Sequence, residues 1–307
     1  MVGFQNYTTM KQKSNLSRRE TLKTLAGSAA VAFAGVSLST RVSAAEAALD
    51  MTVKGKVNHS VCRWCYQSIP LEDLCKAAKD IGLASIELVG PEEWPILKKY
   101  GLTSALPWGA GKGIVDGFNN PTLHNELVKS YEEMIPKVAA QGYNQIICFS
   151  GNRNGLDDEK GIENCAKGLQ RLLPVAEKHK VTLVMELLNS KVDHKDYQCD
   201  HTAWGVALCE KLGSERFKLL YDIYHMQIME GDVIATIRKY NKYISHYHTG
   251  GVPGRNEIDE TQELNYPAIM KAIIETGYKG FVAQEFIPKR PDKLASLKQG
   301  VEICDVA

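Results

Sequence analysis

Four side chains that could bind a metal ion or move a proton each follow an apolar run. The runs span residues 181–185, 217–221, 243–247 and 280–284, and the residues after them are Glu186, Asp222, His248 and Glu285. A carboxylate is costly to bury without a partner of opposite charge. If these three carboxylates and the imidazole meet in one place, they need a shared positive charge, which a divalent cation supplies.

This donor set indicates both the ion and the chemistry. Carboxylate oxygens with one imidazole suit Mn²⁺ or Mg²⁺, and also Co²⁺, better than an ion that prefers thiolates. A metal bound to the oxygens of an α-hydroxy carbonyl compound stabilises the enediolate that forms when the carbon loses its proton. Of the pair Glu186 and Glu285, one carboxylate can remove that proton and the other can return it elsewhere. We therefore expect an isomerase or epimerase with this catalytic pair.

The alternation of the chain predicts a scaffold that brings these residues together. Short apolar or β-branched runs alternate with longer amphipathic segments, which is typical of repeated βα units with parallel strands. The predicted strands are 56–63, 84–89, 102–107, 144–150, 181–187, 217–222, 243–249 and 280–286. The predicted helices are 70–81, 92–99, 121–141, 157–179, 199–212, 228–239, 265–276 and 291–302.

Eight such units in about 250 residues match a (β/α)₈ TIM barrel, an α/β fold whose strand ends meet at one rim. We expect a single catalytic domain over residues 56–307. An open, doubly wound sheet is the alternative, but it would need a glycine-rich fingerprint after the first strand, and residues 63–68 do not have one. His59 is expected to face the barrel interior near the end of the first strand, and Trp108 to wall a pocket after the third.

The first 44 residues resemble an export signal. A basic stretch at 17–23 precedes an apolar run at 25–38, and a small-residue cleavage site precedes Ala45. The Ser-Arg-Arg-x-x-Leu-Lys order is similar to a twin-arginine signal. Because the apolar run is shorter than the ~20 residues of a membrane-spanning helix, we expect export to the periplasm without a stable membrane anchor. Residues 45–55 would form an N-terminal extension. The alternative is a disordered basic tail.

Charge and cysteine content limit the partners. The whole chain has 37 basic and 36 acidic residues, but after residue 44 the balance is 31 to 35, a net charge of −4. Nucleic-acid binding needs clustered positive charge, so we expect a small-molecule partner and no nucleic acid. The eight cysteines are scattered and are expected to be buried apolar residues. A Cys62–Cys65 disulfide and a homo-oligomer both stay open.

Four segments resemble the xylose-isomerase-like barrel superfamily, and within it the hydroxypyruvate isomerases and their sugar epimerase relatives. The segments span residues 183–189, 221–225, 246–257 and 284–286. The resemblance implies metal binding by the residues that match Glu186, Asp222, His248 and Glu285, and acid/base catalysis by the first and last of these. The residues that match His225 and Arg255 hold substrate oxygens in that family.

The resemblance leaves the substrate open between two kinds of compound. It implies conversion of hydroxypyruvate to tartronate semialdehyde, or 3-epimerisation of a ketose or keto-sugar. A histidine at 248 is more typical of ketose 3-epimerases, because hydroxypyruvate isomerases usually have an amide there. A metal-dependent phosphodiesterase and a sugar-binding barrel without catalysis are less favoured alternatives. The substrate-binding candidates are His225, Arg255, His59 and Trp108, whereas His246 is expected to fill the interior of the barrel.

Overall fold

The computed structural model describes residues 55–306. The predicted signal peptide, and the N-terminal extension except for Gly55, lie outside the described residues, so their export role stays a prediction.

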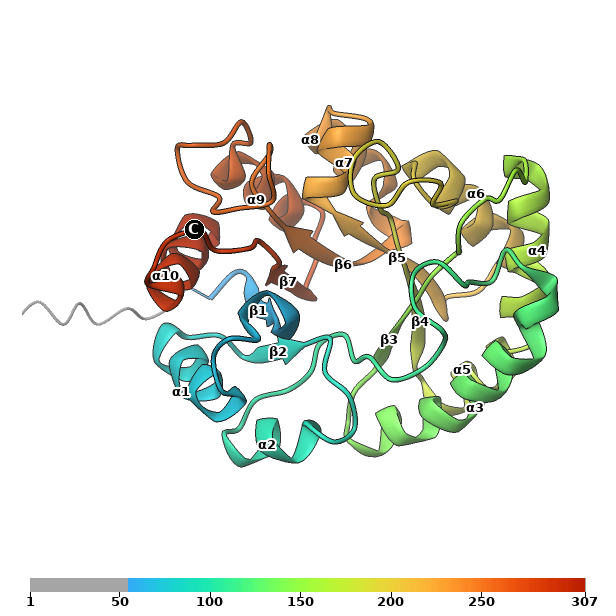
Figure 1. The fold of residues 1–307 in the computed structure, drawn as a ribbon, viewed down its shortest axis with the longest axis horizontal. Helices are drawn as coiled ribbons and strands as arrows, with labels where there is room; N and C mark the ends of the chain where they lie inside the picture. Colours follow the sequence, from blue (N-terminus) through green and yellow to red (C-terminus); the bar gives the residue numbers. More distant parts are fainter. Residues whose placement is uncertain (1–54, 307) are drawn as a thin grey trace, which may run out of the picture. The chain divides into compact units, whose positions relative to one another are not determined.

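The described chain forms a curled parallel sheet surrounded by helices (Figure 1). The sheet has seven strands in the order β2-β1-β7-β6-β5-β4-β3. Their bounds are β1 Asn58–Cys62, β2 Ser85–Glu87, β3 Gln145–Cys148, β4 Thr182–Glu186, β5 Phe217–Asp222, β6 Ile244–Thr249 and β7 Phe281–Gln284. Because all the paired strands run parallel, their carboxyl ends lie at one rim of the barrel.

The predicted third strand, 102–107, is not a regular strand. Thr103 forms only an isolated parallel bridge with Ser85. The segment nevertheless connects β2 to β3, because Leu106 O accepts from Leu88 N–H at 2.9 Å and Pro107 O accepts from Ile147 N–H at 3.4 Å. Pro107 has no N–H to continue a ladder. The prediction of a (β/α)₈ barrel is confirmed, with this irregular segment in the place of the third strand.

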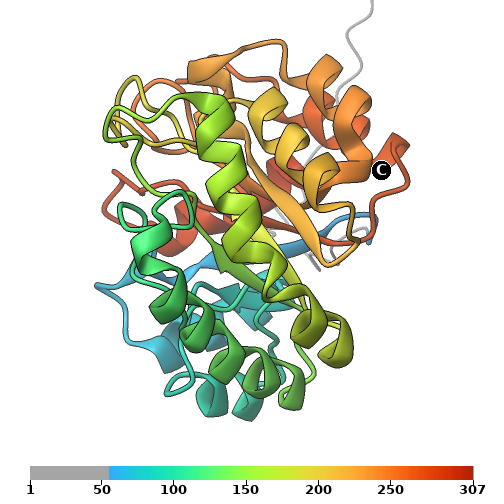
Figure 2. The same cartoon turned by 90° about the vertical axis from the view of Figure 1, so that its right-hand side faces the viewer.

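The helices lie outside the strands, and the side view in Figure 2 shows them packed along the barrel. They are α1 Leu71–Ile81, α2 Trp94–Lys99, α3 His124–Ala140, α4 Asp158–Gln170, α5 Leu173–His179, α6 Thr202–Leu212, α7 Ile223–Met229, α8 Val233–Tyr240, α9 Tyr266–Glu275 and α10 Lys293–Cys304. None of the helices in residues 55–306 has the length and apolar character needed to cross a membrane.

Two helical predictions are wrong in detail. The predicted helix 157–179 is divided into α4 and α5, because Pro174 has no N–H to extend the first helix. The predicted helix 228–239 misses α7, which begins directly after β5. Asp222 caps α7, since its carboxylate accepts from the N–H groups of Tyr224 at 2.8 Å and His225 at 3.3 Å.

All eight cysteines are buried free thiols, as expected from their scattered positions. Cys62 and Cys65 therefore do not form a disulfide in this structure.

Candidate metal centre and active site

The structure brings the four predicted ligands together at the rim. Glu186 ends β4, Asp222 ends β5, His248 lies in β6 and Glu285 follows β7. One ligand atom of each lies within 4.8 Å of the others, and all four residues are buried. We refer to these four residues as the metal centre. Its assembly follows from the parallel register, which pairs Asp222 with His248 and ends the neighbouring strands at the same level.

The imidazole of His248 is oriented by a residue that the sequence analysis missed. Its Nδ1 lies 2.9 Å from Glu285 Oε2 and 3.6 Å from Glu186 Oε1. Its Nε2 lies 2.8 Å from Glu87 Oε1, which is also 2.7 Å from His246 Nε2. Glu87 thereby holds the ring with Nδ1 toward the carboxylates. A glutamate within the apolar run 84–89 was the available signal.

Arg255 and Trp64 hold Glu285 from the other side. Arg255 Nη2 lies 2.7 Å from Glu285 Oε2 and 3.5 Å from Asp222 Oδ2. Trp64 Nε1 donates to Glu285 Oε1 at 2.8 Å. The Arg255 guanidinium also lies between two rings, 5.0 Å from the Trp64 centroid and 5.3 Å from that of Tyr224. Arg255 is therefore at the rim, as expected, and both oxygens of Glu285 have a donor.

His225 lies beside the metal centre with a defined tautomer. Its Nδ1 accepts from the Asn189 backbone N–H at 3.2 Å and lies 2.7 Å from Asn189 Nδ2. We infer that the proton is on Nε2, which lies 3.5 Å from Asp222 Oδ2. Burial, with the positive charge of Arg255 next, lowers the pKa of His225 well below its ordinary value. The ring is neutral, and its Nε2–H lies beside the metal centre. His225 itself is fully buried and is not among the residues that line the cavity described below.

The two predicted acid/base residues have opposite electrostatic surroundings. Burial is the main cause that raises the pKa of Glu186, and the nearby Glu285 carboxylate adds to it. Burial acts in the same direction on Glu285, but the positive charges of His248 and Arg255 outweigh it and hold the pKa of Glu285 well below its ordinary value. Burial and Glu285 also raise the pKa of Asp222 well above its ordinary value. Carboxylates with pKa values pushed apart are suited to separate acid and base roles.

The four residues fit a divalent cation. The oxygen-rich donor set is buried, and Glu186 Oε1 has no hydrogen-bond partner among the described residues. A buried carboxylate oxygen without a donor is unusual. A cation coordinated by this oxygen and by His248 Nδ1 would give the oxygen the partner that it lacks.

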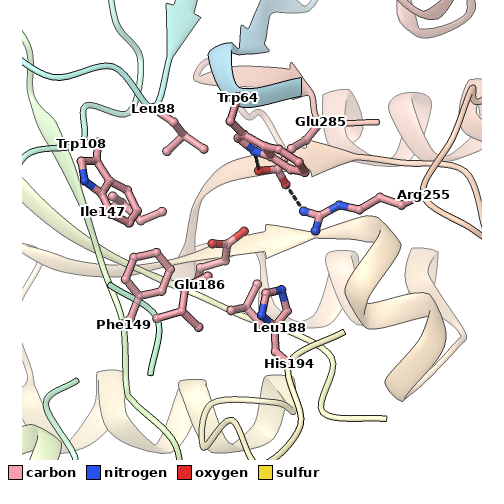
Figure 3. Close-up of a pocket in the computed structure, with 11 residues that line it drawn as sticks. Trp64, Leu88, Trp108, Ile147, Phe149, Glu186, Leu188, His194, Arg255 and Glu285 are labelled. Carbon is pink, nitrogen blue, oxygen red and sulfur yellow. Dashed lines mark hydrogen bonds and ion pairs between the residues drawn. The ribbon is translucent and has the colours of Figure 1, made fainter. Parts of the chain in front are cut away.

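A cavity of about 450 Å³ opens above the metal centre (Figure 3). Glu186, His194, Arg255 and Glu285 form its polar side. The other lining residues are Trp64, Leu88, Trp108, Ile114, Ile147, Phe149 and Leu188. Trp108 thus walls the cavity, as expected.

His59 is not part of the site, and the expectation that it faces the barrel interior is wrong. Its Nε2 lies 3.7 Å from Asp305 Oδ1, just after α10. Side chains alternate along a strand, and on β1 it is Cys62, 3.7 Å from His248 Nε2, that faces the interior. His59 is three residues away and belongs to the opposite face, under the helices.

The family model described as the xylose isomerase-like TIM barrel matches residues 75–304. The chain belongs to this family. It is 35% identical to a 2-oxo-tetronate isomerase of Cupriavidus necator over 109 residues, which are 36% of this chain and 41% of that protein. It is 29% identical to a hydroxypyruvate isomerase of Escherichia coli over 183 residues, which are 59% of this chain and 69% of that protein.

Solved structures share the fold over most of the barrel. A Brucella melitensis structure described as an AP endonuclease of family 2 superposes with a TM-score of 0.71 at 23% identity, covering 78% of this chain and 97% of that one. Structures of a keto-glucoside epimerase and several ketose 3-epimerases have TM-scores of 0.61–0.67 at 14–19% identity. In sequence, the chain spans about two fifths of the length of the first curated relatives that it matches.

Proposed function

We propose that this protein is a metal-dependent isomerase or epimerase that moves a proton between positions of a small α-hydroxy carbonyl compound, as in the conversion of hydroxypyruvate to tartronate semialdehyde. The observation that carries the proposal is the pair Glu186 and Glu285. They enter one buried donor set from β4 and β7, and both line the same cavity. The isomerases among the curated relatives support this reaction class.

Glu186, Asp222, His248 and Glu285 would hold the cation, which we propose to be Mn²⁺ or Mg²⁺, with Co²⁺ as a further candidate. When bound, it polarises the substrate carbonyl and stabilises negative charge on its oxygen. The fit rests on the donor types and on the unpartnered Glu186 Oε1.

The protein residues move the proton and hold the substrate oxygens. Glu186, whose Oε1 has no donor in the described structure, exchanges a proton with the reacting carbon on its side of the cavity. Glu285, held by Trp64 and Arg255, does so on the opposite side. His225 Nε2–H and the Arg255 guanidinium donate to substrate hydroxyl or carbonyl oxygens. Because both carboxylates are buried beside the reacting carbon, they and not bulk water are placed to return the proton.

A 3-epimerase of a ketose or keto-sugar is the second candidate. It uses the same carboxylate pair and returns the proton to the opposite face of the same carbon. The cavity favours it, because a volume of about 450 Å³ accommodates a whole sugar.

The phosphodiesterase alternative has less support from the site. Phosphodiester recognition needs free positive charge. Among the lining residues, Arg255 is the sole lysine or arginine, and it already lies on Glu285.

The test is exchange of the substrate's carbon-bound proton in D₂O, followed by NMR with manganese-loaded protein. We expect exchange with hydroxypyruvate or with a ketose, and no exchange in the Glu186→Gln and Glu285→Gln variants with the fold intact by circular dichroism. A non-catalytic binding barrel would show no exchange with any compound. Tartronate semialdehyde as the product indicates the isomerase, and a C3-inverted sugar indicates the epimerase.

A further inference from the structure

The cavity is larger than a three-carbon keto-acid requires. Hydroxypyruvate has seven non-hydrogen atoms, and even at about 30 Å³ per atom, the share of a water molecule in the liquid, it would occupy about 210 Å³. This is less than half of the cavity volume of about 450 Å³. A substrate of that size would leave space over the rest of the cavity.

The remaining space is bounded by what we call the apolar wall, formed by Leu88, Trp108, Ile114, Ile147, Phe149 and Leu188. Figure 3 shows Trp108, Ile147 and Phe149 on the side of the cavity away from Arg255 and Glu285. The elements divide in the same way except after β4, where Leu188 of the wall and His194 of the polar side lie on the same connection. The wall comes from β3 and from the residues that follow β2, segment 102–107, β3 and β4, whereas the charged groups come from β4, β6 and β7 and the residues after them.

The apolar wall contains an aromatic pair and no charge. The Trp108 and Phe149 rings lie 5.6 Å apart at 52°. Aromatic faces of this kind bind the C–H face of a sugar ring or another aromatic ring. The wall residues carry no positive charge, so this end of the cavity has no ion-pair partner for a phosphate or a second carboxylate.

Large apolar side chains are also exposed at the end of the barrel where the cavity opens. Four large apolar side chains in residues 55–306 are exposed, namely Trp108, Val115, Val192 and Ile287. Trp108 and Val115 follow segment 102–107, Val192 follows β4 and Ile287 follows β7, so all four are on loops after strands at the cavity end.

We propose that the substrate is a neutral molecule of two parts. An α-hydroxy carbonyl sugar unit reaches the metal centre, and a second ring attached to it, either another sugar or an aromatic aglycone, lies on the apolar wall. This inference rests on the proposed function. The second ring undergoes no bond change: the proton leaves and returns on the carbonyl-bearing unit, and the ring contributes binding and orientation.

The experiment compares proton exchange in D₂O across one series of probes with the manganese-loaded protein. The probes are hydroxypyruvate, free 3-ketoglucose, its methyl glycoside, its phenyl glycoside and a 3-keto-disaccharide. We expect kcat/KM for the phenyl glycoside or the disaccharide to exceed that of the free sugar by about tenfold, the effect of one well-formed ring contact. A gain for the disaccharide alone assigns the ring to a sugar, and a gain for the phenyl glycoside alone assigns it to an aromatic group.

Substitutions at Trp108 test whether the apolar wall causes the gain. Because Trp108 is 36% exposed, its replacement should leave the fold intact. The measured ratio is kcat/KM for the phenyl glycoside or the disaccharide divided by kcat/KM for free 3-ketoglucose. We expect Trp108→Ala to bring this ratio to about one, while Trp108→Phe, which retains a ring, preserves most of it. Val192→Ala, an exposed rim residue outside the cavity lining, serves as the control and retains the wild-type ratio.

The outcomes separate this inference from the proposed function. Exchange with hydroxypyruvate or free 3-ketoglucose at a rate equal to the glycosides overturns the two-part substrate and leaves the proposed function in place. A ratio that Trp108→Ala does not change also overturns it. No exchange with any probe overturns the two-part substrate, and the absence of exchange with free ketoses as well overturns the proposed function.

Discussion

Glu87 offers the sharpest test of how the metal centre is built. Its Oε1 lies 2.8 Å from His248 Nε2 and 2.7 Å from His246 Nε2, and the side chains of all three residues are fully buried. Burial alone would raise the pKa of Glu87, but the two histidines outweigh it and lower that pKa to about 2. The carboxylate is therefore ionised and holds the His248 ring with Nδ1 toward the other ligands.

We expect Glu87→Ala to weaken metal binding and to destabilise the fold. Loss of a carboxylate that orients a metal-binding histidine typically costs 10–100-fold in metal affinity. That corresponds to about 1.4–2.7 kcal/mol of binding free energy. The substitution also leaves two buried imidazoles without their acceptor, which costs about 1–3 kcal/mol for each in the free energy of unfolding. Glu87→Gln is the matched control, because its carbonyl oxygen can still accept a hydrogen bond.

Titration calorimetry with Mn²⁺ measures the affinity, and urea unfolding of the metal-free protein measures the stability. We expect the dissociation constants to increase in the order wild type, Glu87→Gln, Glu87→Ala. The electron paramagnetic resonance spectrum of bound Mn²⁺ reports the ligand geometry independently of activity. If Glu87→Ala loses stability but binds Mn²⁺ with wild-type affinity, Glu87 only satisfies buried histidines, and the orienting role is refuted.

Three further outcomes follow from the site and the sequence. Trp64→Phe removes the 2.8 Å hydrogen bond to Glu285 but retains a ring beside Arg255. We expect kcat to fall by about tenfold, because one hydrogen bond to a charged group is lost, with a smaller change in KM. A change in KM alone would contradict a role of Trp64 on Glu285. Dialysis against a chelator should stop exchange and lower the melting temperature, with both restored by Mn²⁺, and turnover insensitive to the chelator would defeat the metal proposal. Replacing both Arg18 and Arg19 by lysine should block export and cleavage before Ala45, as measured by mass spectrometry of the periplasmic protein; unchanged export would refute the twin-arginine assignment.

The strand ends were predictable because their information is local. A carboxylate or imidazole directly after an apolar run marks the end of a buried strand, and parallel strands bring such ends to one rim. This reasoning placed Glu186, Asp222, His248 and Glu285, which the structure assembles within 4.8 Å. The irregular segment at 102–107 was less predictable, because its apolar pattern is that of a strand while Pro107 prevents a regular ladder.

Contacts between side chains on opposite sides of the barrel could not be predicted from local sequence patterns. Glu87 on β2 contacts His248 on β6, although these strands are separated by β1 and β7 in the sheet. No spacing in the chain encodes that contact. The prediction that His59 faces the barrel interior was wrong for a related reason. Both faces of β1 are buried, so apolarity alone does not indicate which face lies inside the barrel.

The amino-acid sequence by itself determined the barrel, the rim and the donor types, because the order of βα units and the residue after each strand are properties of consecutive residues. The tertiary structure alone decided which nitrogen of His248 faces the other ligands, that Trp64 and Arg255 hold Glu285, and that a cavity of about 450 Å³ has an uncharged aromatic side. These features depend on the curvature of the closed sheet and on side-chain directions, which bring together residues far apart in the chain.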